Sequence, residues 1–233
     1  MNKIFSFIFM VIAGLAMSGC QKNESPASQA SLNIVHAIVN VPAIKVNRYG
    51  SGTIYSTFID SVKFGANEVI TVVSGNSVPV SVVNTADTLH PVFNGNINVS
   101  AGSITSLFLA GQSTSVDTIT VQDVIPYRAD STAGVRFINL LVNSNPVSIN
   151  IKGNANGSEV TSLAYKANTG FKNYTALNIN ASYIFEIRDA GTGTLITSYT
   201  LTTPRFLNVT LCLKGLSGAT GTNAPGIMLV KNY

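Results

Sequence analysis

The chain has 233 residues, of which 45% are hydrophobic and 10% are charged, so it can bury one large core or two small ones and is not a disordered chain. Its formal net charge of +4 comes from 14 basic and 10 acidic residues. The basic residues stand singly, and no run of them could neutralise several phosphates, which argues against nucleic-acid binding.

The first twenty residues predict an export signal that ends at a lipid-attachment cysteine. Asn2-Lys3 is a short positive segment, Ile4–Ala16 is almost wholly apolar, and Met17-Ser18-Gly19-Cys20 places small residues before a cysteine. This segment resembles a lipobox, although Met17 stands where that pattern prefers leucine. The resemblance implies a signal peptide over residues 1–19 and acyl chains on Cys20, through which the protein would bind the membrane.

Two alternatives stay open for this segment. An ordinary signal peptide cut after Ala16-Met17-Ser18 also fits the rule for small residues at a cleavage site, but it leaves Cys20 unexplained. A retained membrane helix is disfavoured, because the apolar stretch falls short of the roughly 20 residues that a span needs.

Residues 20–30 are predicted to carry the lipidated cysteine and a flexible polar tether. Within it, Gln21-Lys22-Asn23-Glu24 is a weak form of the lysine-plus-acid signal for the outer face of the outer membrane. We therefore expect a lipid-anchored protein of the cell envelope, at the outer membrane, and leave open whether it faces the periplasm or the outside.

Beyond the tether, apolar and polar residues alternate with period two and no long helical stripe is found, so the chain is predicted to be all-β. Turns are expected at Gly75-Asn76, Asn94-Gly95, Asn156-Gly157 and Gly191-Thr192-Gly193. The clearest strands are expected at Leu32–Ile38, Ile44–Asn47, Val69–Val73, Val78–Val83, Ile104–Leu109, Val135–Leu141, Val147–Ile151, Tyr183–Ile187, Leu195–Leu201 and Leu207–Leu213.

The two halves of this body echo each other. Ser106–Gly111 matches Thr210–Gly215, Ile34–Ala37 parallels Phe137–Leu140, and a further match aligns residues 62–65 with 163–166. The repeat predicts two tandem β-sandwich domains, immunoglobulin-like or transthyretin-like, over residues 31–121 and 133–233, with residues 122–132 as the linker.

The same residues resemble a known family. The chain is similar to bacterial envelope lipoproteins of the domain of unknown function 4397 family, through His36-Ala37, Pro42-Ala43-Ile44-Lys45-Val46, Phe64-Gly65 and Ala101-Gly102-Ser103-Ile104-Thr105. Lys45 stands where the family usually has an acid, and Asn139 replaces the histidine in the second half, so the second copy has diverged. The resemblance implies a β-sandwich envelope module with no established chemistry.

A search for catalytic and metal-ligating residues finds no convincing set, so we expect no enzyme, no metal and no cofactor. His36 lies in an alternating apolar strand and is expected to be packed or hydrogen-bonded, whereas His90 before Pro91 is expected at the surface. Cys212 alternates with leucines and is interpreted as a small buried apolar residue. The glycine-rich stretch Gly215–Gly226 lacks the lysine of a phosphate loop and is predicted to be an ordinary loop.

Four aspartates precede a serine or threonine in a pattern that resembles a bacterial O-glycosylation acceptor. The candidate acceptors are Ser61, Thr88, Thr118 and Ser131. The same pairs also initiate turns through hydrogen bonds from backbone to side chain, and both interpretations stay open.

The composition and the fold class favour a non-enzymatic binding or adhesion module for a protein or a glycan. Tryptophan is absent, and the tyrosines that could replace it as stacking platforms are Tyr49, Tyr55, Tyr127, Tyr165 and Tyr174. The alternative is a structural spacer or assembly subunit. A remote alternative is a hydrolase in which His36 or His90 meets an aspartate and a hydroxyl in a cleft.

Overall fold

The computed structural model describes residues 27–47, 55, 61–128, 131–176, 182–202 and 205–232. Cys20 and the signal peptide therefore lie outside the described residues, as does Tyr49. In the described part the chain is built from strands β1 to β16 and one short 3₁₀ turn, η2 (Gly221–Asn223). None of its helical segments is long and apolar enough to cross a membrane.

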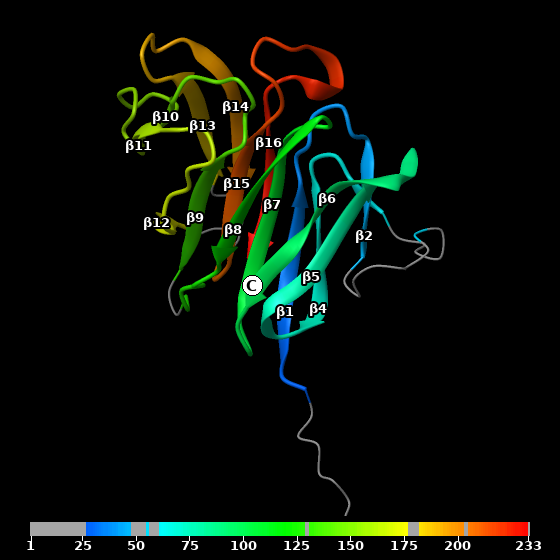
Figure 1. Cartoon of the computed structure of the whole chain (residues 1–233). Coiled ribbons are helices and arrows are strands. Elements are labelled where there is room, and N and C mark those ends of the chain that lie inside the picture. Colours follow the sequence, from blue (N-terminus) through cyan, green and yellow to red (C-terminus); the bar gives the residue numbers. More distant parts are fainter. Residues whose placement is uncertain are drawn as a thin grey trace, which may run out of the picture.

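The first half forms a sandwich of two four-stranded sheets (Figure 1). Sheet I has the order β4-β1-β7-β8, and its strands are β4 (Ala66–Val73), β1 (Gln29–His36), β7 (Ile104–Gln112) and β8 (Ser115–Gln122). Sheet II has the order β3-β2-β5-β6, and its strands are β3 (Val62–Lys63), β2 (Ala43–Asn47), β5 (Gly75–Asn84) and β6 (Asp87–Val99). Neighbours are antiparallel except β1 and β7, which run parallel.

The second half repeats this arrangement. Sheet III has the order β12-β9-β15-β16, with β12 (Lys172–Thr175), β9 (Thr132–Asn139), β15 (Asn208–Lys214) and β16 (Gly226–Asn232). Sheet IV has the order β11-β10-β13-β14, with β11 (Val160–Leu163), β10 (Val147–Ile151), β13 (Ser182–Asp189) and β14 (Leu195–Thr202). Here β9 and β15 are the parallel pair.

The strand order distinguishes the two sandwich types that the sequence allowed. An immunoglobulin sandwich keeps its first and second strands in one sheet. In both halves of this chain the first and second strands lie in different sheets, and the first strand pairs with the seventh. The predicted all-β fold of two sandwiches is confirmed, and its strand order is transthyretin-like.

Each sandwich has its own apolar core, which the period-two pattern produces directly. In β1, Leu32 and Ile34 point between sheets I and II and are fully buried with Ile44, Val80 and their neighbours. Between sheets III and IV the corresponding cluster includes Phe137 and Phe185, whose rings meet edge to face with centroids 5.2 Å apart.

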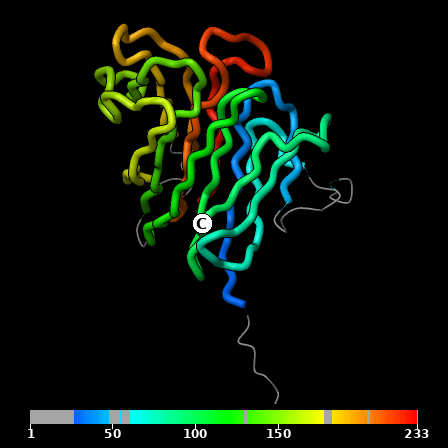
Figure 2. Tube along the Cα trace, in the orientation of Figure 1, coloured from blue at the N-terminus to red at the C-terminus, as the bar shows by residue number. Residues whose placement is uncertain are grey.

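A third apolar cluster joins the two sandwiches. It places Val35 and Phe108 of sheet I against Ile138, Cys212 and Met228 of sheet III. The central strands are therefore buried on both faces, which explains why their sequences are nearly continuous apolar runs. The four sheets form one layered body, and the tube in Figure 2 shows the two halves side by side.

Polar contacts fix the segment between β8 and β9 against this body. The Asp123 carboxylate lies 2.7 Å from the Arg136 guanidinium, and both side chains are buried. Ser106 donates a 2.6 Å hydrogen bond to the same carboxylate, and Arg136 donates one of 3.0 Å to Thr210. The predicted linker is thus held against residues of β7, β9 and β15.

All ten expected strands coincide with observed strands, and the corrections concern turns and edges. Gly75-Asn76 and Asn94-Gly95 are not turns but parts of β5 and β6. Gly95 leaves room for the Phe93 ring, because a Cβ there would lie 2.9 Å from that ring. The strands that the pattern did not mark are mostly short or lie at sheet edges: β3, β6, β8, β11, β12 and β16.

Candidate functional site

His36 is a structural residue at the end of β1. Its ring is fully buried, its Nδ1 accepts a 3.3 Å hydrogen bond from the Ile38 amide, and its Nε2 lies 2.9 Å from the Val41 carbonyl oxygen. Because Nδ1 accepts, Nε2 carries the proton and donates, so the ring is neutral. Burial lowers the pKa of His36 from 6.5 to about 4, and the bond to Val41 opposes part of this shift.

Asn139 has the same structural role in the second sandwich. Its Oδ1 accepts a 3.0 Å hydrogen bond from the Leu141 amide, just as His36 Nδ1 accepts from Ile38. Its Nδ2 donates to the Leu163 carbonyl oxygen at 3.1 Å. The exchange of histidine for asparagine between the two copies therefore preserves a strand-end hydrogen bond and removes no chemistry.

Cys212 is fully buried in the cluster between sheets I and III, as expected from its place in the repeat opposite Phe108. Burial raises the pKa of its thiol. A buried thiol of this kind is inert while the two sandwiches stay together.

Two polar hollows lie on either side of the turn between β7 and β8. The Tyr165 hollow has a volume of about 290 Å³ and is lined by Gly111, Gln112, Thr114, Ser115, Asp117, Val142, Asn143, Ser144 and Tyr165. The His90 hollow has a volume of about 340 Å³ and is lined by Asn84, Asp87, His90, Pro91, Val92, Ser113, Thr114 and Val116. Thr114 lines both hollows.

The fold puts these hollows at the end of the molecule opposite the point where the N-terminal segment enters. That segment enters at Gln29, and β1 spans about 26 Å at the usual rise per strand residue. β7 runs parallel to β1, so the turn after Gln112 lies at the far end (Figure 1). We call the two ends of the body the tether end and the distal end.

The Tyr165 hollow is assembled from both sandwiches. Tyr165 donates a 3.0 Å hydrogen bond to Asp117 of β8, and Lys166 lies 2.7 Å from the other oxygen of the same carboxylate. The hydrogen bond from Lys166 lowers the pKa of Asp117, and the bond from Tyr165 adds to the effect. Lys166 has a φ of +68°, which places it in the left-handed region where the first half has Gly65. The carboxylate therefore stays ionised and holds the wall of the hollow.

The His90 hollow contains an imidazole, a carboxylate and two hydroxyls. His90 Nδ1 lies 2.9 Å from Asp87 Oδ2, and the hydrogen bond from His90 lowers the pKa of Asp87. Ser113 and Thr114 line the same hollow, but among the described residues no hydrogen bond joins the imidazole to a hydroxyl. The His90 side chain is 82% exposed, as expected for a surface residue. The hollow can form hydrogen bonds with a ligand but does not show an activated nucleophile.

The candidate acceptors of sugar lie apart from one another. Thr118 is exposed on the edge strand β8, Ser61 is exposed just before β3, and Thr88 and Ser131 are half-buried. Asp87 accepts hydrogen bonds from the Leu89 and His90 amides, at 3.1 and 3.3 Å. These bonds agree with the interpretation that the Asp87-Thr88 pair initiates a turn. Glycosylation at the four positions stays a prediction.

The tyrosines differ in their availability. Tyr174 is buried and donates to Glu159, and Tyr55 donates a 2.7 Å hydrogen bond to Ser81. Tyr165 is half-buried in the wall of its hollow, whereas Tyr127 is 91% exposed. Tyr127 lies at the tether end, because the neighbouring Pro126 carbonyl accepts a hydrogen bond from Asn208 at the start of β15.

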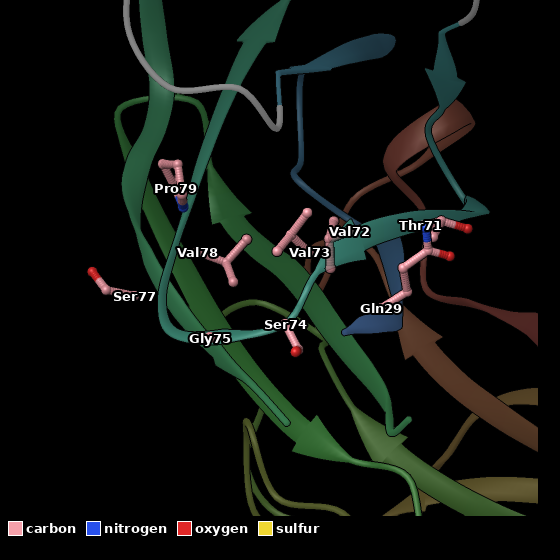
Figure 3. Close-up of a pocket in the computed structure, with 9 residues that line it drawn as sticks. All are labelled: Gln29, Thr71, Val72, Val73, Ser74, Gly75, Ser77, Val78 and Pro79. Carbon is pink, nitrogen blue, oxygen red and sulfur yellow. The ribbon is translucent and has the colours of Figure 1, made fainter. Parts of the chain in front are cut away.

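A third hollow lies at the tether end, in the corner where the chain passes from β4 to β5 (Figure 3). It has a volume of about 400 Å³ and is lined by Gln29, Thr71, Val72, Val73, Ser74, Gly75, Ser77, Val78 and Pro79. Its lining is more apolar than that of the distal hollows.

Comparison with known proteins adds little to this geometry. No protein-family model matches the chain, and no curated protein matches it. Among solved structures, the family CBM26 module of Eubacterium rectale Amy13K, determined in complex with maltoheptaose, is similar at 8% identity over 88% of this chain and 97% of that chain, with a TM-score of 0.27. We draw no functional conclusion from a likeness this distant.

Among the described residues, no group of three metal-ligating side chains is found.

The sequence analysis named His90 and Tyr165, but it missed the other residues of the two distal hollows. The polar run Gln112-Ser113-Thr114-Ser115 between two alternating segments marks a turn and could have been noted. Its neighbours Asn143, Ser144 and Tyr165 come from the other sandwich, and no local pattern connects them with that turn.

Proposed function

We propose that this protein is a lipid-anchored, non-enzymatic binding module that presents a glycan-binding surface at its distal end. The observation that carries the proposal is the pair of polar hollows that share Thr114 and lie opposite the end where the N-terminal segment enters. In a module held to a membrane by its N-terminus, the far end is the end that points away from the membrane.

The chemistry of the hollows favours a neutral polyhydroxylated ligand. Amide, hydroxyl and carboxylate groups line them, and such groups donate to and accept from sugar hydroxyls. The Asp117 carboxylate is paired with Lys166, so its charge is compensated within the wall. Because the side chains belong to two sandwiches joined by a buried cluster, the surface is preorganised.

The anchoring part of the proposal is supported by the lipobox-like segment that ends at Cys20. Ala27, the first described residue, lies two residues before β1, so a short segment connects Cys20 with the sandwich. The outer membrane is the membrane that we propose.

A single bulky substitution tests the binding surface. Thr114→Arg should obstruct both hollows and weaken binding to immobilised neutral oligosaccharides by at least about tenfold, which corresponds to roughly 1.4 kcal/mol. Thr120→Arg is the matched control, because Thr120 is exposed on β8 but lines neither hollow. Gln112→Ala and His90→Ala would then assign the ligand to one hollow. Equal binding by the Thr114→Arg and Thr120→Arg proteins would contradict the proposal.

The spacer alternative is favoured by one observation, the cluster that fuses the two sandwiches into a stiff body. It predicts that no oligosaccharide binds and that the distal substitutions have no effect. The same measurement of binding to immobilised oligosaccharides therefore separates the two functions.

A further inference from the structure

We infer that the tether end of the body rests on the lipid surface itself, with Tyr127 and Phe206 at the level of the headgroups. This inference deepens the proposed function, because it rests on the acyl anchor at Cys20. It concerns a surface that belongs to the folded body and not to the tether.

Large apolar side chains are exposed at this end. The exposed fraction is 91% for Tyr127, 79% for Val124, 59% for Val73 and 48% for Phe206. Isolated exposed apolar residues are common on proteins, but a group at one end of a body is informative.

Backbone contacts show that these residues share one end. Val73 pairs with Gln29, where β1 begins, and the Gly102 amide donates to the Gln29 carbonyl oxygen. The Asp123 amide donates to Ile104 at the start of β7, which places Val124 beside that strand end. Phe206 lies just before β15, and its amide donates to the Thr132 carbonyl oxygen. The more apolar hollow in the β4–β5 corner opens at the same end (Figure 3).

The charges at this end fit an anionic surface. Arg205 is exposed and its guanidinium lies over the Phe206 ring, 5.0 Å from the centroid, and Lys231 is exposed near the end of β16. The Asp123 carboxylate at this end is buried and paired with Arg136. An aromatic ring beside a guanidinium is the combination that interfacial surfaces use, since the ring enters the headgroup layer and the cation pairs with phosphates.

The length of the N-terminal segment keeps the tether end close to the membrane if the anchor is present. Seven peptide units separate Cys20 from Ala27, and a fully extended chain of that length spans at most about 25 Å. The tether end is therefore kept within a short distance of the headgroups. Phe206 also holds a φ of +64°, an unusual conformation for a bulky residue, and its side chain is half-exposed.

The absence of tryptophan from the chain provides a direct test. Tyr127→Trp introduces a single reporter at the tether end, and Leu89→Trp is the matched control at the distal end, where Leu89 is 84% exposed. The acylated proteins are reconstituted into vesicles of phosphatidylcholine and phosphatidylglycerol with brominated acyl chains, which quench nearby indoles. We expect the emission of Trp at position 127 to shift to shorter wavelength and to lose intensity, and that at position 89 to do neither.

The outcomes separate docking from anchoring. If the proteins sediment with the vesicles but both reporters remain unquenched, the anchor holds and the docking inference is wrong. If they do not sediment, and behave like a Cys20→Ala protein, the anchor itself fails and docking fails with it. A shift at position 127 that appears in detergent and grows with protein concentration would assign the face to a second copy of the chain, and would equally overturn the inference.

Discussion

At the scale of single residues, the comparison of His36 with Asn139 shows that His36, a candidate catalytic residue, has a structural role. Both side chains accept a hydrogen bond from the amide two residues later and donate to a carbonyl oxygen. An amide group reproduces the hydrogen bonds of a neutral imidazole but cannot act as a base. The position is therefore used for strand termination in both copies.

The burial of His36 predicts a specific dependence of stability on pH. Its pKa is about 4 when folded and near 6.5 when unfolded, so the unfolded chain binds a proton first as the pH falls. The contribution to the free energy of unfolding is fully present above pH 6.5 and is lost between pH 6.5 and about 4, up to roughly 3 kcal/mol. Denaturant unfolding of the wild type and of His36→Asn at pH 7 and pH 4.5 measures this.

The His36→Asn protein should lose less stability across that interval than the wild type, because the amide does not titrate. Both proteins keep His90, so the difference between them isolates His36. Parallel pH profiles for the two proteins would show that this imidazole does not titrate as its burial requires.

At the scale of elements, periodicity found the strands whose two faces differ or that are buried throughout. It did not mark β8 and β16, which lie at sheet edges, or the two-residue β3. The repeat between residues 106–111 and 210–215 did identify β7 and β15 as equivalent strands, and their register with β1 and β9 bears this out. The sequence could not predict which residues of the opposite sheet a strand packs against, because those contacts join residues that are distant in sequence.

The ion pair that holds the segment after β8 gives a second prediction. Asp123→Asn leaves the buried Arg136 guanidinium without a counter-charge, and we expect a loss of about 3–5 kcal/mol in the free energy of unfolding. Asp117→Asn is the control, because the Asp117–Lys166 pair is partly exposed and should contribute at most about 1 kcal/mol. Denaturant titration of both proteins measures these losses. Similar small losses of unfolding free energy in the two proteins would mean that the Asp123 carboxylate is not buried away from solvent.

At the scale of the whole molecule, the sequence predicted two sandwiches but not their union. The residues that join them, such as Phe108 and Cys212, occupy the second face of strands whose first face already forms a core. In the sequence, an apolar residue at such a position cannot be told from an ordinary core residue, and the repeat predicted two domains without indicating whether they pack together. The Tyr165 hollow depends on this union, since Thr114 and Tyr165 come from different sandwiches.

The buried thiol of Cys212 can measure how firmly the two sandwiches are joined. In a Cys20→Ala protein it is the sole thiol, and a reagent reaches it only when sheets I and III separate or the chain unfolds. The second protein carries Val80→Cys and Cys212→Ala in the same Cys20→Ala background, so its sole thiol lies in the core of the first sandwich. If the body is one cooperative unit, labelling of each thiol under native conditions should give a free energy of opening equal to that of global unfolding of the same protein. If Cys212 reacts much faster than the thiol at position 80, the sandwiches separate while each stays folded, and a binding surface built from both could not be preorganised.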